Sequence, residues 1–132
     1  MAKSFEELSV YQKARELVIR IYSLTELEPW RSDFRFVGQI HAAAGSVADN
    51  IAEGFEREGN KEFVNFLFYA KGSLGETRSQ IIRAFDVHYI DKETFDSLYG
   101  ECLCLSKQLS KFIASLRSST FKGSKHLDSF ES

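Results

Sequence analysis

Apolar residues recur at intervals of three and four along most of the chain, which is the spacing of one face of an α-helix. The first stripe consists of Val10, Ala14, Leu17, Ile21 and Leu24. The Ser-x-x-Glu pattern of residues 4–7 predicts a capping box, in which the two side chains satisfy backbone N–H groups at the start of this helix. Pro29 lacks a backbone N–H, so it predicts the end of the helix within residues 28–31.

A second apolar stripe begins after Ser32 or Asp33, either of which can cap a helix. It consists of Val37, Ile40, Ala44, Val47 and Ile51. A glycine inside a helix costs about 1 kcal/mol relative to alanine, so Gly45 predicts that another backbone approaches closely there. Gly54 is typical of a helix stop, and residues 56–60 form a polar connection.

A third helix is expected from a cap at Asn60 to about His88. Its first half is apolar around most of the circumference, and such a helix has to be buried on more than one side. A bundle of this size has one core, so we expect part of this surface to contact another subunit. The candidates for that interface are Phe63, Phe66, Phe68 and Tyr69.

The last apolar stripe follows Asp91, which can cap a fourth helix, and consists of Phe95, Leu98, Cys102, Leu105, Leu109, Phe112 and Leu116. Short connections force each helix to return beside the one before it. Residues 1–117 are therefore expected to form one all-α domain, an antiparallel up-down-up-down four-helix bundle. Residues 118–132 lose the periodicity and turn to Ser, Lys, Gly and His, which predicts a disordered tail.

Composition narrows the range of functions. The chain has 132 residues, enough for one core, and a net charge of -2, which provides no overall attraction to phosphate. The N-terminus lacks the apolar segment of a signal peptide, and no apolar run is long enough to span a membrane, so a cytoplasmic protein is expected. Cys102 and Cys104 are two residues apart, which suits neither a disulfide nor a chelate, and both are interpreted as packing residues.

Catalytic motifs are missing from the sequence. The Glu-x-x-His pairs of di-iron bundles are absent at His41, His88 and His126, and there is neither a Gly-rich phosphate loop nor a nucleophile motif. We therefore expect no catalytic residue, no metal site and no cofactor. His41 lies near the second apolar stripe and is interpreted as a hydrogen-bonded boundary residue in preference to a catalytic base.

Polar residues near the end of the second helix leave two interpretations open. Glutamate in the last turn of a helix opposes the helix dipole, so Glu53 needs a partner. Asn50 and Glu53 either hold the connection to the third helix, through Arg57 or backbone N–H groups, or form a ligand site; we favour the first. Lys71 and Arg78 share a helix face and either bind phosphate or are simply solvated, and we favour solvation.

The chain resembles a known family through residues of the second and third helices. These are Gln39-Ile40, Ala43-Ala44, Ser46-Val47, Asn50-Ile51-Ala52-Glu53-Gly54 and Arg57, then Glu62-Phe63, Phe66-Leu67, Ala70-Lys71-Gly72-Ser73-Leu74 and Glu76. The family is that of four-helix-bundle proteins encoded by intervening sequences of bacterial 23S ribosomal RNA genes. The resemblance implies a cytoplasmic homopentamer without established enzymatic activity, related to the accessory variability protein of diversity-generating retroelements, which associates with nucleic acid and reverse transcriptase. It also implies a structural polar motif made of Gln39, Ser46, Asn50, Glu53, Gly54, Ser73 and Glu76.

The chain departs from this family at His41 and Ala42, where members commonly carry arginines. Each lost phosphate contact removes counterion-release free energy, so this departure weakens an expectation of nucleic-acid binding. We therefore expect a non-enzymatic homo-oligomer that acts as an assembly or macromolecular interaction protein. The alternative is an RNA- or DNA-binding accessory module, linked to ribosomal RNA intervening sequences or to a reverse transcriptase. Its candidate contacts are Lys13, Arg20, Arg57, Lys61, Lys71 and Arg78.

Overall fold

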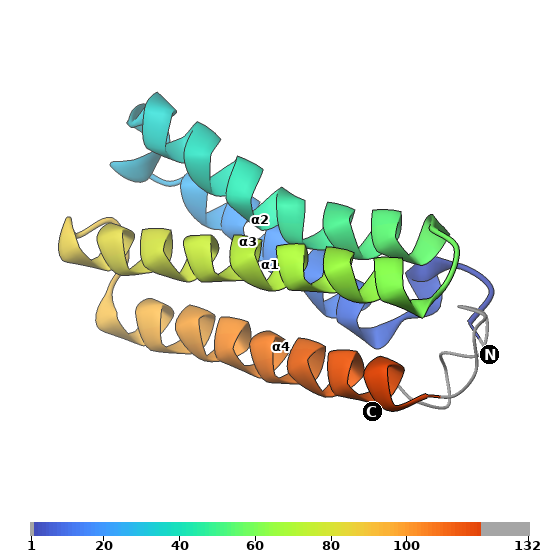
Figure 1. Ribbon diagram of the computed structural model, residues 1–132. Coiled ribbons are helices and arrows are strands. Elements are labelled where there is room, and N and C mark those ends of the chain that lie inside the picture. The colour runs from blue at the N-terminus through green and yellow to red at the C-terminus, as the bar shows by residue number, and fades with distance from the viewer. Residues whose placement is uncertain (1, 120–132) are drawn as a thin grey trace.

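The protein is all-α, as the apolar periodicity predicts. The computed structural model describes residues 2–119, and within them the helices are α1 (Ser9–Thr25), α2 (Phe34–Glu56), α3 (Asn60–Asp86) and α4 (Lys92–Ser118). Short 3-10 turns, η1 (Phe5–Glu7) and η2 (Trp30–Ser32), precede α1 and α2. Successive helices run in opposite directions, which gives the expected four-helix bundle (Figure 1). Of the predicted tail, Ser118 is the last residue of α4, and residues 120–132 lie outside the described residues.

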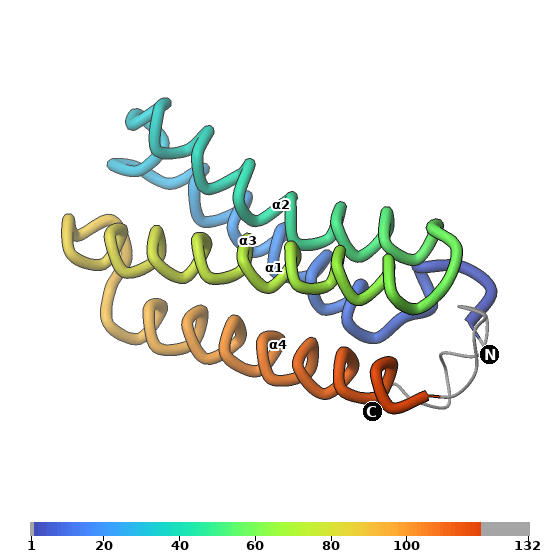
Figure 2. Tube along the Cα trace, viewed as in Figure 1, coloured from blue at the N-terminus to red at the C-terminus, as the bar shows by residue number. Residues whose placement is uncertain are grey.

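The helices pack in cyclic order, so that each has two principal neighbours. α2 lies between α1 and α3, and α4 lies between α3 and α1. α2 and α4 are therefore diagonal to one another. The α2–α3 connection, the start of α1 and the end of α4 lie at one end of the bundle, and the α1–α2 and α3–α4 connections lie at the other (Figure 2).

The predicted apolar stripes form the core. Val10, Ala14, Leu17 and Ile21 of α1 are fully buried, and Ile40, Ala44, Val47 and Ile51 face them from α2. Three aromatic rings seal the core near the α2–α3 connection. Phe63 makes edge-to-face contacts with Phe55, with ring centroids 6.0 Å apart, and with Phe112, at 5.5 Å. Such contacts add to the hydrophobic free energy of burial, so this cluster is a major source of stability.

The opposite end of the bundle is closed by an aromatic cluster that the periodicity does not predict. Trp30 is fully buried in η2, and its ring centroid lies 5.2 Å from that of Phe36 and 5.9 Å from that of Tyr89. Tyr89 Oη donates a hydrogen bond of 2.8 Å to Asp33 Oδ2, and this bond is the main cause of the raised pKa of Tyr89. The α1–α2 and α3–α4 connections are thus tied together.

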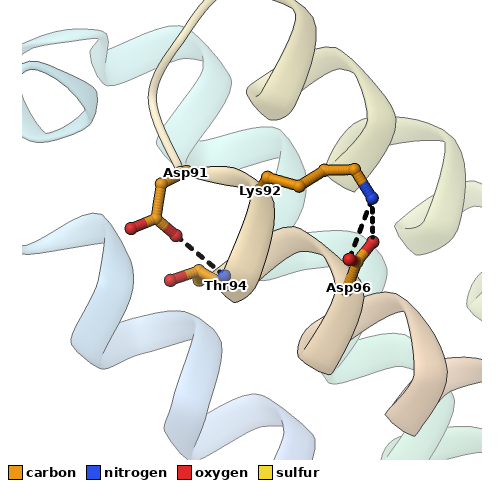
Figure 3. A network of polar contacts seen from close by, with 4 residues as sticks. All are labelled: Asp91, Lys92, Thr94 and Asp96. Carbon is orange, nitrogen blue, oxygen red and sulfur yellow. Dashed lines mark hydrogen bonds and ion pairs between the residues drawn. The ribbon is translucent and has the colours of Figure 1, made fainter.

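Two caps were predicted correctly. Asp33 Oδ1 accepts a hydrogen bond from the Phe36 N–H at 3.2 Å at the start of α2. Asp91 Oδ1 accepts one from the Thr94 N–H at 2.8 Å at the start of α4 (Figure 3). Because this bond favours the charged carboxylate, it lowers the pKa of Asp91. Each cap satisfies an N–H group that has no partner within its helix.

The other helix starts differ from the predictions. The Ser4 side chain makes no capping hydrogen bond; a 3-10 turn follows it, and α1 begins only at Ser9. Glu7 Oε1 accepts its hydrogen bond from the Lys3 N–H, at 3.4 Å, where a capping box would use the N–H of the serine. Asn60 is the first residue of α3 and not its cap, because Gly59, with φ 83, takes the cap position.

The glycine predictions were wrong at both positions. α2 continues through Gly54 and ends at Glu56, so Gly54 is not a helix stop. A Cβ on Gly54 would lie 2.6 Å from Phe66 Cβ and 2.9 Å from Phe63 Cδ1, whereas one on Gly45 would meet no atom within 4 Å. The close approach that the sequence suggests at Gly45 therefore occurs at Gly54, because α3 turns back against α2 there.

Candidate interaction site

The predicted polar motif lies along α2 and α3, and its centre is a small hydrogen-bonded cluster. Asn50 Nδ2 donates to the Ser46 carbonyl at 2.8 Å and to Ser46 Oγ at 3.0 Å. Ser73 Oγ donates to Ser46 Oγ at 2.9 Å, which joins α3 to α2. The prediction that Asn50 holds the α2–α3 connection was wrong. Asn50 instead positions the hydroxyl group through which the two helices contact each other.

Glu53, by contrast, does support the connection. Glu53 Oε2 lies 2.7 Å from Arg57 Nη2, and Arg57 Nη1 lies 3.6 Å from Glu62 Oε2 at the start of α3. The Arg57 guanidinium also lies 5.0 Å from the centroid of the Phe66 ring. The hydrogen bond that Arg57 donates to Glu53 is the main cause of the raised pKa of Arg57. These contacts give Glu53 the partner that its position in the last turns of α2 requires.

Of the remaining motif residues, Gln39 and Glu76 lie at the surface, and Gly54 lies in the contact between α2 and α3. Gln39 is exposed on α2. Glu76 is exposed on α3, and its Oε2 accepts a hydrogen bond of 3.2 Å from Gln80 Nε2. Gly54 allows the close approach described above. The motif therefore organises the packing of α2 against α3, and it contains no arrangement of an acid, a base and a nucleophile.

Most of the candidate nucleic-acid contacts are occupied within the chain. Arg20 Nη1 lies 2.8 Å from Glu101 Oε1, and Arg20 Nη2 donates to Ser97 Oγ at 2.9 Å. Arg57 is held by the two glutamates already described. Only Lys13 and Lys61 are exposed and have no ion pair with another residue in the range 2–119.

Lys71 and Arg78 do not form a solvated face, contrary to the prediction. Lys71 Nζ donates to Ser110 Oγ at 2.7 Å and to Ser106 Oγ at 3.1 Å, both on α4. The Arg78 guanidinium lies 5.7 Å from the centroid of the Tyr99 ring, also on α4. Periodicity placed the two residues on one face of α3 correctly, but that face is covered by α4.

The candidates for a subunit interface divide into two groups. Phe63 is fully buried in its own bundle, so it was wrong as an interface candidate. Phe66 is half-buried beneath Arg57. Phe68 and Tyr69 are 42% and 59% exposed, and both remain available to a partner. The all-round apolar character of this segment is thus shared between the core and the outer surface.

His41 is a boundary residue, as predicted. One of its ring nitrogens, Nε2, lies 2.8 Å from Thr25 Oγ1, and the ring stacks on Tyr22 with centroids 3.7 Å apart. Partial burial lowers the pKa of His41. These contacts pack α2 against α1, and neither of the two partners is a carboxylate that would orient the imidazole as a base.

The two cysteines differ in burial, and neither belongs to a cluster of possible metal ligands in the range 2–119. Cys102 is buried, and desolvation raises the pKa of its thiol to about 12, so it is a packing residue as predicted. Cys104 is exposed, and the same prediction was wrong for it. In the range 2–119 no three His, Cys, Asp or Glu side chains gather as metal ligands would. Nor does any helix in this range have the length and apolar character needed to cross a membrane.

Sequence reasoning missed a basic groove between α1 and α4. It has a volume of about 370 Å³ and is lined by Ser9, Lys13, Cys104, Lys107, Gln108 and Lys111. Lys107 and Lys111 are one turn apart on α4, and this spacing was the available signal. The position of Lys13 opposite them depends on how α1 packs against α4, which periodicity alone does not give.

The fold defines the class of protein, which is an all-α four-helix bundle. Its polar motif joins α2 to α3 through Asn50, Ser46 and Ser73. The chain belongs to the 23S rRNA-intervening sequence protein family, whose model matches residues 6–111. No curated protein matches the chain.

Solved structures share this fold, and one example is a crystal structure. It is a protein of unknown function from the S23 ribosomal protein family of Bacteroides thetaiotaomicron, with a TM-score of 0.74 and 24% sequence identity. The match covers 80% of this chain and 95% of that one.

Proposed function

We propose that this chain is a non-enzymatic, homo-oligomeric protein of the cytoplasm, which acts as an assembly or macromolecular interaction protein. The observation that carries the proposal is a set of glycines on the outer sides of α2 and α3. A Cβ on Gly38, Gly45, Gly72 or Gly75 would meet no atom within 4 Å. Each glycine costs the helix about 1 kcal/mol relative to alanine, and no contact among residues 2–119 requires it. A helix of another subunit, packed closely against these positions, would supply the reason.

Exposed apolar side chains support the same proposal. Phe34 is 81% exposed, Tyr69 59% and Phe68 42%. The surface thus carries exposed aromatic side chains and also glycine positions with open space beside them. In a contact between two copies, the aromatic rings of one copy can pack against the glycines of the other. A second copy is therefore the partner that fits best. A pentamer is the stoichiometry implied by the family resemblance.

Size-exclusion chromatography with light scattering tests the proposal. The wild-type chain is expected to have a mass several times its 15.1 kDa. Gly45→Leu and Gly72→Leu should reduce that mass while the circular dichroism spectrum stays helical. Ser23→Leu introduces the same leucine side chain at an exposed position of α1 and serves as the control. A wild-type mass of 15.1 kDa at micromolar concentration would exclude the proposal.

A second candidate function is an RNA- or DNA-binding accessory module, associated with ribosomal RNA intervening sequences or a reverse transcriptase. The observation in its favour is that Lys13 and Lys61 are exposed without ion pairs in the range 2–119. Mobility shifts with structured RNA and duplex DNA at low salt would test it, because phosphate contacts weaken steeply as salt increases. Absence of any shift at low salt would exclude this function.

A further inference from the structure

The basic groove between α1 and α4 is built by residues that the proposed self-assembly has not used. Its wall on α4 carries Lys107 and Lys111, and its wall on α1 carries Lys13. Gln108 Nε2 donates to Ser9 Oγ at 2.7 Å and so bridges the two helices within the groove. All three lysines are exposed, and none has an ion pair with a residue in the range 2–119.

Charge is segregated around this groove. From Cys102 to Ser118, α4 contains no Asp or Glu, so no acidic side chain of its own lies one turn from these lysines. Like charges one turn apart on a helix repel each other. α4 therefore contributes only positive charge to this groove, although the whole protein has a net charge of -2. On α1, Glu16 lies one turn from Lys13 but forms no ion pair in the range 2–119.

The matching negative charge lies on α2. Asp49, Glu53 and Glu56 are exposed and follow one another at spacings of four and three, so they form one outward stripe, here called the acidic stripe. Carboxylates in the second half of a helix oppose its dipole. Glu53 has Arg57 as its partner, but neither Asp49 nor Glu56 has an ion pair with a residue in the range 2–119.

The two surfaces lie at one end of the bundle but face different directions. The second halves of α2 and α4 and the first half of α1 all lie toward the end that carries the α2–α3 connection (Figure 1). α2 is diagonal to α4, so the acidic stripe and the basic groove do not overlap. One subunit can therefore bind one neighbour through its groove and another through its stripe.

We infer that the basic groove of one copy binds the acidic stripe of the next copy. This inference rests on the proposed self-assembly and adds a charged contact to the glycine-bearing faces of α2 and α3 described above. Lys107 and Lys111 form a row of positive charge on α4, and Asp49 and Glu56, which have no ion pair in the range 2–119, form a row of negative charge on α2. The two surfaces are therefore complementary in charge. A contact between two different surfaces is heterologous, and repeated with a closing rotation it produces a ring.

Charge reversal tests the assignment by light scattering on the full chain. Lys107→Glu with Lys111→Glu should shift most of the protein from oligomer to monomer, and Asp49→Lys with Glu56→Lys should do the same. The variant with all four changes should recover the oligomer, because the attraction is restored with its signs exchanged. Arg31→Glu with Arg35→Glu, which changes the same charge at the other end of the bundle, should leave the mass unchanged.

The possible failures can be distinguished. A monomeric wild-type chain would remove the proposed self-assembly and this inference with it. An oligomeric wild type whose mass neither reversal changes would overturn only the inference. A Lys107 and Lys111 reversal that leaves the mass unchanged but abolishes binding of structured RNA would also overturn it, because the groove would then serve a polyanion.

A measurement on the wild-type chain guards against variants that fail to fold. Cys104 lines the groove and is exposed, whereas Cys102 is buried. A bound neighbour would cover Cys104, so its alkylation by a neutral reagent should be several-fold slower in the oligomer than after dilution to monomer. Equal rates in the two states would overturn the inference.

Discussion

The α2/α3 contact and the α1/α4 contact have opposite characters. Between α2 and α3, Gly54 lies so close to Phe63 and Phe66 that there is no room for a methyl group. Between α1 and α4, long polar side chains such as Arg20 and Glu101 meet at the surface, and a groove of about 370 Å³ remains open beside them. The α2/α3 contact therefore depends on close apolar packing, and the α1/α4 contact depends partly on charged side chains.

This difference indicates how the molecule divides its tasks. Close apolar packing tolerates no change in volume, so the α2/α3 contact specifies the fold. Exposed charges contribute little to folding, so those on α1 and α4 are available for a partner. Mutations of buried residues should therefore affect stability, and mutations of exposed residues should affect assembly.

The largest expected effect is on the closed side. Phe63→Ala removes a fully buried ring that contacts two others, and it should lower the free energy of unfolding by about 3–5 kcal/mol. Tyr69→Ala, six residues along the same helix, should change it by less than about 0.5 kcal/mol but reduce the oligomer mass. Urea denaturation and light scattering on both variants measure the two effects. Equal losses of stability would contradict the division.

A glycine pair provides a more subtle test. Gly54→Ala should destabilise the fold by about 1–3 kcal/mol, because the new methyl group would overlap two phenylalanines. Gly45→Ala should stabilise the monomer by about 1 kcal/mol, since its methyl group meets nothing within 4 Å. Urea denaturation of both variants at concentrations where the chain is monomeric gives the comparison. Destabilisation by Gly45→Ala under those conditions would mean that α2 has a close neighbour at Gly45 within the monomer, which would contradict the structure.

The sequence predicted the core faces and two of the caps, because apolar periodicity and the side chains of Asp33 and Asp91 act locally. It placed the glycine contact nine residues too early. Gly45 and Gly54 are equivalent as residues in a helix, and only the return of α3 against α2 distinguishes them. Periodicity cannot determine where two helices approach most closely.

The site was less predictable for the same reason. Charge type and spacing identified Arg20, Lys71 and Arg78 as cations on helix faces, but not that α4 provides partners for all three. The groove lysines Lys107 and Lys111 lie in the segment that was interpreted only as a core stripe. Whether a charged residue is free depends on its neighbours across the bundle, and those are set by tertiary packing.

Between α1 and α4, removal of the ion pair between Arg20 and Glu101 should have only a small effect on the free energy of unfolding. Arg20→Met breaks the contact with Glu101 but keeps an apolar stem against α4, so the expected loss is about 0.2–1 kcal/mol. The loss should shrink in high salt, because salt screens half-exposed charges. Thermal denaturation at low and high salt measures it. If Arg20→Met lowered the stability as much as Phe63→Ala, this ion pair would be as important to the fold as the buried aromatic core, which would contradict the account.

The smallest effect concerns His41. Its pKa is lowered from 6.5 by burial, so the unfolded chain binds this proton more readily than the folded one. Stability should therefore be complete above pH 6.5, fall as pH drops below that value, and level off below the folded pKa. His41→Gln should remove this dependence, and His88→Gln should not, as measured by Tm across the pH range. A Tm that rises on acidification through the same range would contradict the assigned direction.

Self-association is the central claim, and sedimentation equilibrium of the full wild-type chain over a wide concentration range tests it most directly. The account predicts an average mass several times 15.1 kDa at micromolar concentration, decreasing toward 15.1 kDa on dilution or in high salt. A single species of 15.1 kDa at every concentration would contradict it, because the exposed glycines and charges would then have no partner of their own kind.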